Sequence, residues 1–345
     1  MVPSRAARFF SDPGRFVSLS SLDIPSTSLE DYFPIDLKNI IPNSVVTFPV
    51  YYPVYRTLRK ELLFARLLES GESCTAETIQ FFAEKGISVA YVHKSSLKIL
   101  AGYLEDTTRS CINSPHVSTD QKTQFIYRHA AFLVERVFRD PRIGHVIGDA
   151  SKWAKIVGTF LQKDEMTPAC LCRIFSKDYT TFTHSIQVCL LGMAFGAYLK
   201  WGKEEIAEFG VGSLFHDLGK IWIDKRILQK PGTLSEKEFS HIRKHPRLGY
   251  RHLKGMGAIP AGALEIVLQH HENSDGQGYP LGLKGREIHP LARVAHIVDC
   301  YDALTTKRPY KGPLPPYKAL KLMYEEMRTS FDLDLLKRFI HFLGR

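Results

Sequence analysis

The chain has 345 residues and a mass of 39.2 kDa, a size that suits two domains or one large one. Apolar residues make up 44% and charged residues 24%, as in globular proteins with an ordinary core. The net charge of +10 favours an anionic partner, such as a nucleic acid, a nucleotide or a membrane surface. The longest uncharged apolar run, residues 188–199, is too short to span a bilayer, and the N-terminus lacks the apolar stretch of a secretory signal. We therefore expect a cytoplasmic protein without a transmembrane segment.

The first third of the chain predicts a small α/β module. Residues 1–34 are rich in Ser, Pro and Arg and are expected to be loosely structured. Within residues 35–105, the stretch 44–55 alternates β-branched and aromatic residues, which indicates a strand. The stretch 74–93 predicts a helix that stops at Gly86 and is followed by a strand.

The remaining two thirds predict a helical domain. Residues 106–122 are polar and contain proline, which favours a linker. From residue 123 to residue 345 nearly every segment has helical periodicity. The expected fold class is therefore mainly α, with the small α/β module in front. The cysteines are scattered without a CxxC pair, so we expect reduced and mostly buried thiols. They are Cys74, Cys111, Cys170, Cys172, Cys189 and Cys300.

His216 and Asp217 are adjacent within the apolar stretch "VGSLFHDLGKI". A polar group in such a setting costs several kcal/mol unless it is paired or bound to a metal. A single buried histidine is more often a satisfied core residue. Imidazole beside carboxylate, however, is a common pair for divalent metals, and an aspartate has two oxygens with which to bridge two ions.

Two further stretches carry similar residues. In "ARVAHIVDCYDAL", the residues His296, Asp299 and Asp302 follow one another at three-residue steps and lie near one helix face, although Asp302 could equally lie on a solvated face. In "LQHHE", His270 and His271 would point about 100° apart on a helix, so only a helix end aims both at one centre. The glycines that follow allow such an end, while His271 alone could also be a C-terminal cap.

The remaining histidines are expected to be surface or loop residues. His241 precedes His245 by four residues, but Pro246 restricts the backbone there, so we do not include His241 in the site. The others in this class are His93, His116, His129, His145, His252, His289 and His341.

In this order, the segments resemble the HD-GYP family of the HD phosphohydrolase superfamily. The resemblance covers roughly residues 175–335 and rests on "THSIQV", "HDLGK", "KHPRLG", "HHENSDGQGYPLGLKGREI", "ARVAHIVDCYDAL" and "RPYK". It implies an all-helical HD-domain core that begins at about residue 123. It also implies hydrolysis of the bacterial second messenger cyclic di-GMP to linear pGpG or GMP, through a hydroxide activated by two metals.

The resemblance also implies the residues that hold the metals. His184, His216 and Asp299 would complete the first ion, and Asp217 would bridge the two ions. The second ion would take the remaining histidines of the motifs. The full ligand set is His184, His216, Asp217, His245, His270, His271 and Asp299.

Substrate-binding roles follow from the same resemblance. Lys220 would act in catalysis together with Asp217, through contact with the scissile phosphate or the attacking water. Tyr279 belongs to the Gly-Tyr-Pro loop and would contact the substrate. Asp302 is also assigned to the substrate site, at a position just behind the metal ligands. Arg308 and Lys311 would grip the substrate phosphates.

One position departs from the family pattern. Family members with three metals carry a glutamate four residues before the first histidine, where this chain has Thr180. A hydroxyl is a poor replacement for a bridging carboxylate, so we expect two divalent transition metals. The ligand types favour iron, then manganese, with zinc as a further candidate.

Three functions stay open on the sequence. The first is an active cyclic di-GMP phosphodiesterase. The second is a catalytically weak receptor that binds cyclic di-GMP, or a GGDEF-type partner protein, for signalling. The third is an HD phosphohydrolase that acts on another nucleotide. We do not expect a nucleic acid as a partner, and we expect residues 35–105 to be a regulatory module.

Overall fold

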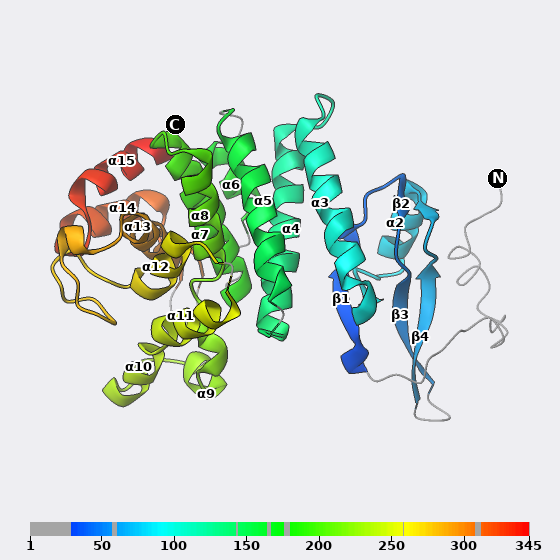
Figure 1. Ribbon diagram of the computed structural model, residues 1–345, viewed down its shortest axis with the longest axis horizontal. Helices are drawn as coiled ribbons and strands as arrows, with labels where there is room; N and C mark the ends of the chain where they lie inside the picture. Colours follow the sequence, from blue (N-terminus) through cyan, green and yellow to red (C-terminus); the bar gives the residue numbers. More distant parts are fainter. Residues whose placement is uncertain are drawn as a thin grey trace. The chain divides into compact units, whose positions relative to one another are not determined.

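The computed structural model describes residues 29–56, 61–142, 144–163, 167–175, 180–257, 259–307 and 312–344 (Figure 1). The internal contacts divide the chain into two compact units, Met1–Asn113 and Ser114–Arg345. Most of the loosely structured segment that we expected at 1–34 falls outside the described residues. Its last residues are ordered, because a short 3-10 helix at Leu29–Asp31 leads into a strand.

The first unit contains a four-stranded sheet in the order β1-β6-β3-β4, in which all neighbours are antiparallel, and a separate pair, β2-β5. The stretch 44–55 forms two strands, not one. Phe48 turns fully into the core and Pro49 has no amide hydrogen for a ladder, so pairing is interrupted there. The strands are β1 (Tyr32–Asp36), β2 (Ser44–Val46), β3 (Val50–Arg56), β4 (Glu61–Leu68), β5 (Glu72–Cys74) and β6 (Val89–His93).

Two helices complete the first unit. Helix α2 (Ala76–Glu84) begins at Thr75, whose Oγ1 accepts a hydrogen bond from the backbone amide of Thr78. The chain leaves α2 through Gly86, which has a φ of 71° that suits glycine, and enters β6. The expected order of helix, glycine stop and strand is therefore confirmed. Helix α3 (Leu97–Asn113) follows β6.

The expected linker at residues 106–122 is mostly helical. Helix α3 continues to Asn113, because its buried residues recur at helical spacing up to Ile112. Helix α4 begins at Thr119, after a capping box between Ser118 and Gln121. The division between the two units falls at 113/114, so a boundary at residue 123 would lie inside α4.

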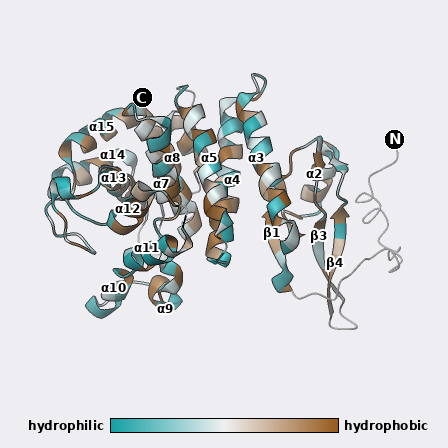
Figure 2. Cartoon of the chain, viewed as in Figure 1, coloured by the Kyte–Doolittle hydropathy of each residue, from teal (hydrophilic) through white to brown (hydrophobic). Residues whose placement is uncertain are grey.

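The second unit is helical, as the sequence predicted. Apolar helix α7 is buried along most of its length and packs against α4, α8 and α13. In contrast, α10 lies at the edge of this unit and is rich in hydrophilic residues (Figure 2). The helices are α4 (Thr119–Arg139), α5 (His145–Leu161), α6 (Pro168–Ile174), α7 (Thr181–Tyr198), α8 (Lys203–Leu214), α9 (Lys225–Leu228), α10 (Glu236–Ile242), α11 (His245–Met256), α12 (Ala261–Gln269), α13 (Pro290–Thr305), α14 (Pro316–Glu325) and α15 (Leu333–Leu343).

The prediction that the histidine of α4 lies at the surface is wrong. His129 is only 2% exposed, because it shares the buried face of α4 with Ile126 and Leu133. About two helical turns after His129, buried Arg136 pairs with Asp149 of α5 at 2.9 Å. The helical spacing of His129 from Ile126 and Leu133 would have been enough to predict that it lies on the inner face.

The cysteines and the apolar helices are the subjects of two further expectations. The cysteine side chains that are described are free thiols, mostly buried, and the side chain of Cys172 is not among them. None of the helices within the described ranges has both the length and the apolar character needed to cross a membrane.

Candidate metal centre

The adjacent His216 and Asp217 lie in the turn between α8 and a short 3-10 helix, η5 (Leu218–Trp222), and not inside a helix. This turn packs tightly against the start of α11. A Cβ atom on Gly219 would lie 1.9 Å from the carbonyl oxygen of His245, so only glycine allows the approach. The close contact brings His245 beside Asp217, with 3.3 Å between Nε2 and Oδ1.

Four histidines share one orientation, with Nδ1 bonded away from the centre. Nδ1 of His216 donates to the carbonyl oxygen of Ser213 at 2.6 Å, and Nδ1 of His245 donates to that of Ile242 at 2.7 Å. In His270 the same nitrogen faces carbonyl oxygens of its own helix end, and in His184 it faces a carboxylate. Such bonds fix the tautomer and leave the Nε2 lone pair available, as in histidines that bind metals.

The two oxygens of Asp217 face two different groups of histidines. Oδ2 lies 3.7 Å from Nε2 of His184 and 3.6 Å from Nε2 of His216. Oδ1 faces His245, whose Nε2 is 3.2 Å from Nε2 of His270. The ligand atoms thus form two compact groups that share Asp217, namely His184, His216 and Asp217, and Asp217, His245, His270 and His271.

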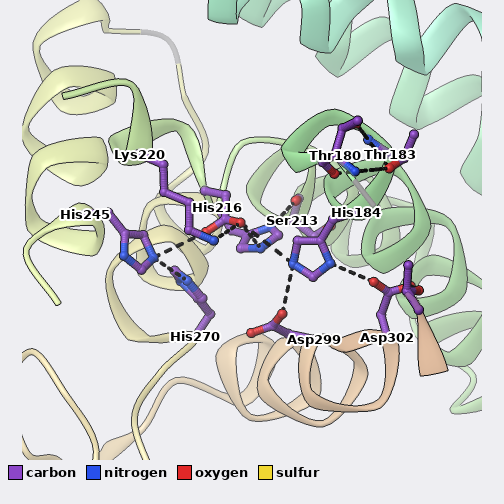
Figure 3. A network of polar contacts seen from close by, with 12 residues as sticks. Thr180, Thr183, His184, Ser213, His216, Lys220, His245, His270, Asp299 and Asp302 are labelled. Carbon is purple, nitrogen blue, oxygen red and sulfur yellow. Dashed lines mark hydrogen bonds and ion pairs between the residues drawn. The ribbon is translucent and has the colours of Figure 1, made fainter. Parts of the chain in front are cut away.

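Asp299 of α13 lies between the same two groups. Its Oδ1 is 3.0 Å from Nε2 of His184, and its Oδ2 is 3.8 Å from Nδ1 of His271 (Figure 3 shows the first contact). Helix α12 ends at Gln269, so His270 and His271 occupy the turn that follows, where their ring centroids are 4.1 Å apart. The helix end therefore aims both imidazoles at one region, as their adjacency had suggested.

Burial and charge determine the protonation of this cluster. Burial lowers the pKa of His216, and lowers that of His245 to about 4, so both are neutral at pH 7. Burial alone would raise the pKa of Asp217. Lys220 and the surrounding histidines instead hold it well below its usual value. Neutral imidazoles and ionised carboxylates are the forms in which these side chains bind metals.

The donors that remain without partners fit a metal. Among the described residues, the buried Nε2 of His216 and Oδ1 of Asp217 have no hydrogen-bond partner. Polar atoms left in this way are costly, and a bound cation would satisfy both. The donor set of imidazole nitrogens and carboxylate oxygens matches divalent transition metals.

A buried glutamate organises the loop after the paired histidines. Glu272 is 1% exposed, and its carboxylate accepts hydrogen bonds from the backbone amides of Leu281 at 2.5 Å and Leu283 at 2.9 Å. A Cβ atom on Gly278 would lie 2.2 Å from the backbone nitrogen of Asn273, so the loop closes tightly at that glycine. The closure places a tyrosine over the cluster.

That tyrosine is Tyr279. Its backbone nitrogen donates to the carbonyl oxygen of His271 at 3.0 Å, and its ring lies 4.7 Å from the ring of His271. Burial raises the pKa of Tyr279, so its hydroxyl stays protonated at neutral pH. Nζ of Lys220 lies 2.5 Å from Oδ2 of Asp217, beside the same cluster.

The structure also describes two other positions that the sequence singled out, Asp302 and Thr180. Asp302 is 3% exposed and contacts the far side of His184, with Oδ2 2.7 Å from Nδ1, so it supports this histidine from behind. Thr180 caps α7, where its Oγ1 accepts from the amide of Thr183 at 3.1 Å. Arg308 and Lys311 lie outside the described residues.

Sequence reasoning missed Gln187, and it gave no role to His296 beyond a place on the helix face of Asp299 and Asp302. Gln187 donates to Oδ1 of Asp302 at 3.2 Å, and His296 donates from Nδ1 to the carbonyl oxygen of His270 at 3.0 Å. The role of Glu272 was also missed. Its position directly after two histidines was the available signal, but its partners lie nine and eleven residues further along the chain.

Comparisons with known proteins agree with this geometry. A family model described as an HD domain matches residues 174–335. Cyclic di-GMP phosphodiesterase PA4108 of Pseudomonas aeruginosa is 34% identical over 226 residues, which is 63% of this chain and 54% of that protein. The cyclic di-GMP phosphodiesterase response regulator RpfG of Xanthomonas campestris is 42% identical over 132 residues, covering 38% of this chain and 35% of its own length.

Two further proteins are similar to this chain, one in sequence and one in structure. A 3'3'-cGAMP-specific phosphodiesterase 3 of Vibrio cholerae is 37% identical over 120 residues, covering 35% of this chain and 26% of the relative. Among solved structures, Bd1817, an HDG"Y"P protein from Bdellovibrio bacteriovorus, superposes with a TM-score of 0.69 at 19% identity, covering 91% of this chain and all of that one. This last similarity concerns the fold alone.

The helical fold and the cluster of histidines and aspartates thus define an HD domain over residues 174–335. The chain carries this HD domain within its second unit. It spans about half the length of PA4108, and smaller shares of the other relatives named above.

Proposed function

We propose that this protein is a metal-dependent phosphodiesterase that hydrolyses cyclic di-GMP to pGpG or GMP. The observation that carries the proposal is the position of Asp217, whose two oxygens face two separate groups of histidines. A carboxylate placed in this way can hold two cations close together, which is the arrangement that phosphodiester hydrolysis uses. The names of PA4108 and RpfG support the choice of substrate.

The residues proposed to hold two metals follow from the contacts. His184, His216 and Asp299 would bind the first ion and Asp217 both ions, while the second would also take His245, His270 and His271. We propose iron, with manganese next and zinc as a further candidate. Thr180 supports a count of two, because its hydroxyl already caps α7 in place of a third carboxylate ligand.

Bound divalent ions would supply charge neutralisation at the phosphate and would lower the pKa of a water molecule. The protein side chains supply the rest. The ammonium group of Lys220, held by Asp217, would contact the scissile phosphate or orient the attacking water. Tyr279, with its protonated hydroxyl, would line the entrance and offer a hydrogen bond to the substrate.

The central experiment is turnover by the metal-loaded protein. Anaerobically purified chain would be loaded with iron or manganese, incubated with cyclic di-GMP, and its products separated by chromatography. We expect pGpG or GMP to form, and their formation to stop when a chelator removes the metal. Binding of cyclic di-GMP without turnover would contradict the proposal and restore the receptor hypothesis. Parallel incubation with 3'3'-cGAMP separates the two substrates named among the relatives.

We also propose that the first unit regulates the HD domain and that GGDEF-type proteins are partners of the chain. Support for a separate role comes from the contact division at 113/114 and from the position of the proposed ligands, which all lie in the second unit. A chain that begins at Ser114 should keep its metals and any activity of the full chain. Loss of metal from this shortened chain would contradict the regulatory assignment.

A further inference from the structure

An arginine near the proposed centre is held by aromatic rings. Arg243 follows α10, and its Cζ atom lies 4.5 Å from the ring centroid of Phe239 and 5.5 Å from that of Tyr279. Contacts of a guanidinium with two aromatic faces restrict its motion and leave its N–H groups free to donate in the guanidinium plane. Phe239 itself is 39% exposed, so the pair lies at the surface of the molecule.

Over the described part of the chain, Arg243 has no ion pair and no side-chain hydrogen bond. Glu238 of α10 does not pair with Arg243. Its carboxylate pairs with Lys230 at 2.7 Å and accepts a hydrogen bond from the backbone amide of Ser235 at 2.7 Å. An exposed arginine that is fixed by rings and is not neutralised by a carboxylate is suited to an anionic ligand.

The position of Arg243 relative to the centre restricts which anion it can reach. The ring of Tyr279 lies 4.7 Å from that of His271 and also contacts Arg243, so one tyrosine ring is shared by the proposed ligand and the guanidinium. Within the described residues Arg243 has no ion pair with Asp217, so a phosphate held at Asp217 and Lys220 leaves its guanidinium available for a different anionic group. A cyclic dinucleotide carries a second phosphodiester across its sugar–phosphate ring from the first.

We propose that Arg243, fixed by Phe239 and Tyr279, binds the phosphodiester of the cyclic dinucleotide that is not being cleaved. This inference rests on the proposed function and adds a substrate contact to it. Arg243 would select a substrate with two phosphodiesters over a substrate with one. Its bidentate N–H groups suit the two free oxygens of a phosphodiester.

The test compares two substrates of the metal-loaded full-length protein. Cyclic di-GMP has two phosphodiesters and bis(p-nitrophenyl) phosphate has one, so only the first can use Arg243. We expect Arg243→Ala to raise KM for cyclic di-GMP by roughly 10- to 100-fold, the usual effect of losing a hydrogen bond to a charged group. Rates on bis(p-nitrophenyl) phosphate, metal content and melting temperature should not change. Arg243→Lys should recover part of the loss, since charge remains without the planar fork.

The matched control is Lys244→Ala, which removes one positive charge from the next, also exposed, residue. It should leave KM near that of the wild type. An unchanged KM in Arg243→Ala would overturn the inference. An equal loss of activity on cyclic di-GMP and bis(p-nitrophenyl) phosphate would overturn it too. A rise in KM that differs between cyclic di-GMP and cyclic di-AMP would also overturn it, because it would indicate contact with a base. A wild-type protein that cleaves bis(p-nitrophenyl) phosphate but not cyclic di-GMP would instead overturn the proposed function, and this inference with it.

Discussion

Asp302 accepts a hydrogen bond from Nδ1 of His184 across 2.7 Å, on the side of the imidazole that faces away from the cluster. The bond leaves Nε2 of His184 pointing toward Asp299 and Asp217 (Figure 3). Gln187 and Thr306 hold the other oxygen of Asp302, at 3.2 and 3.3 Å. The orientation of a proposed ligand is thus determined by residues of α7 and α13 together.

The first prediction concerns this support. Asp302→Ala should lower metal affinity at the centre by roughly 10- to 100-fold, because the orientation and basicity of His184 are lost. Asp302→Asn should lose less, because its amide oxygen can still accept from Nδ1. Metal titration monitored by elemental analysis would measure both. Asp334→Ala, at an exposed position of α15, is the control. Equal metal affinity in Asp302→Ala and the wild type would contradict the supporting role.

The second prediction separates the bridging residue from a residue of one group. Asp217→Ala should remove both metals, since both of its oxygens face proposed ligands. His184→Ala should weaken mainly the metal of the first group, because its contacts are with Asp217 and Asp299 and not with His245. Elemental analysis after dialysis would give the metal count for each variant. Retention of two metals by Asp217→Ala would refute the assignment.

The third prediction concerns the loop that Glu272 holds. Glu272→Gln keeps one acceptor oxygen but turns an amide group toward the second backbone amide, so the free energy of unfolding should fall by roughly 1–3 kcal/mol. Urea unfolding of the metal-free protein would measure the change. Glu287→Gln is the matched control, because its carboxylate also accepts from a backbone amide, that of Lys284 at 2.8 Å, but in an exposed position. If both variants lose the same small amount, the loop does not depend on Glu272.

The fourth prediction is a pH dependence that comes from α4. Burial, and to a lesser extent the charge of Arg136, lowers the pKa of His129 to about 3. In the unfolded chain the pKa returns to about 6.5, so below that pH the unfolded state binds a proton that the folded state does not. Stability from this group is therefore present above pH 6.5 and is lost as the pH falls toward 3.

Between pH 7 and pH 5 the loss from His129 should be roughly 2 kcal/mol. His129→Gln does not titrate, so its free energy of unfolding should fall less over the same interval, whatever its stability at pH 7. Urea unfolding of both metal-free proteins at the two pH values would provide the comparison. Parallel pH profiles would show that His129 does not remain neutral in the folded protein.

The fifth prediction concerns Arg308, proposed to grip a substrate phosphate. Arg308→Ala should leave the metal content unchanged and weaken cyclic di-GMP binding by roughly 1.5–3 kcal/mol, while Arg308→Lys should recover only part of the affinity. Calorimetric titration of metal-loaded protein would measure this. Lys307→Ala removes the neighbouring charge and serves as the control. Unchanged affinity in Arg308→Ala would make this loop an ordinary solvated surface.

Local sequence was sufficient for much of the fold, whereas the full set of proposed ligands came from the resemblance of the motifs to a known family. The start of α2 at Thr75 and the stop at Gly86 could be predicted because capping and a positive φ depend on a few neighbouring residues. The helical period of the second unit is local in the same sense. His216 and Asp217 stood out because polar residues in apolar segments need partners wherever the chain folds, and His270 stood out because it is adjacent to His271.

The tertiary structure decided how those residues are used. His184 and Asp302 are 118 positions apart, and only the packing of α7 against α13 places the carboxylate behind the imidazole. Glu272 reaches two amides of its own loop only after the loop has closed at Gly278. Arg243 gained a proposed role because Phe239 and Tyr279, from separate segments, meet at its guanidinium. Such contacts depend on which faces of distant segments pack together, and that choice is made by the burial of the whole core, which no single segment encodes.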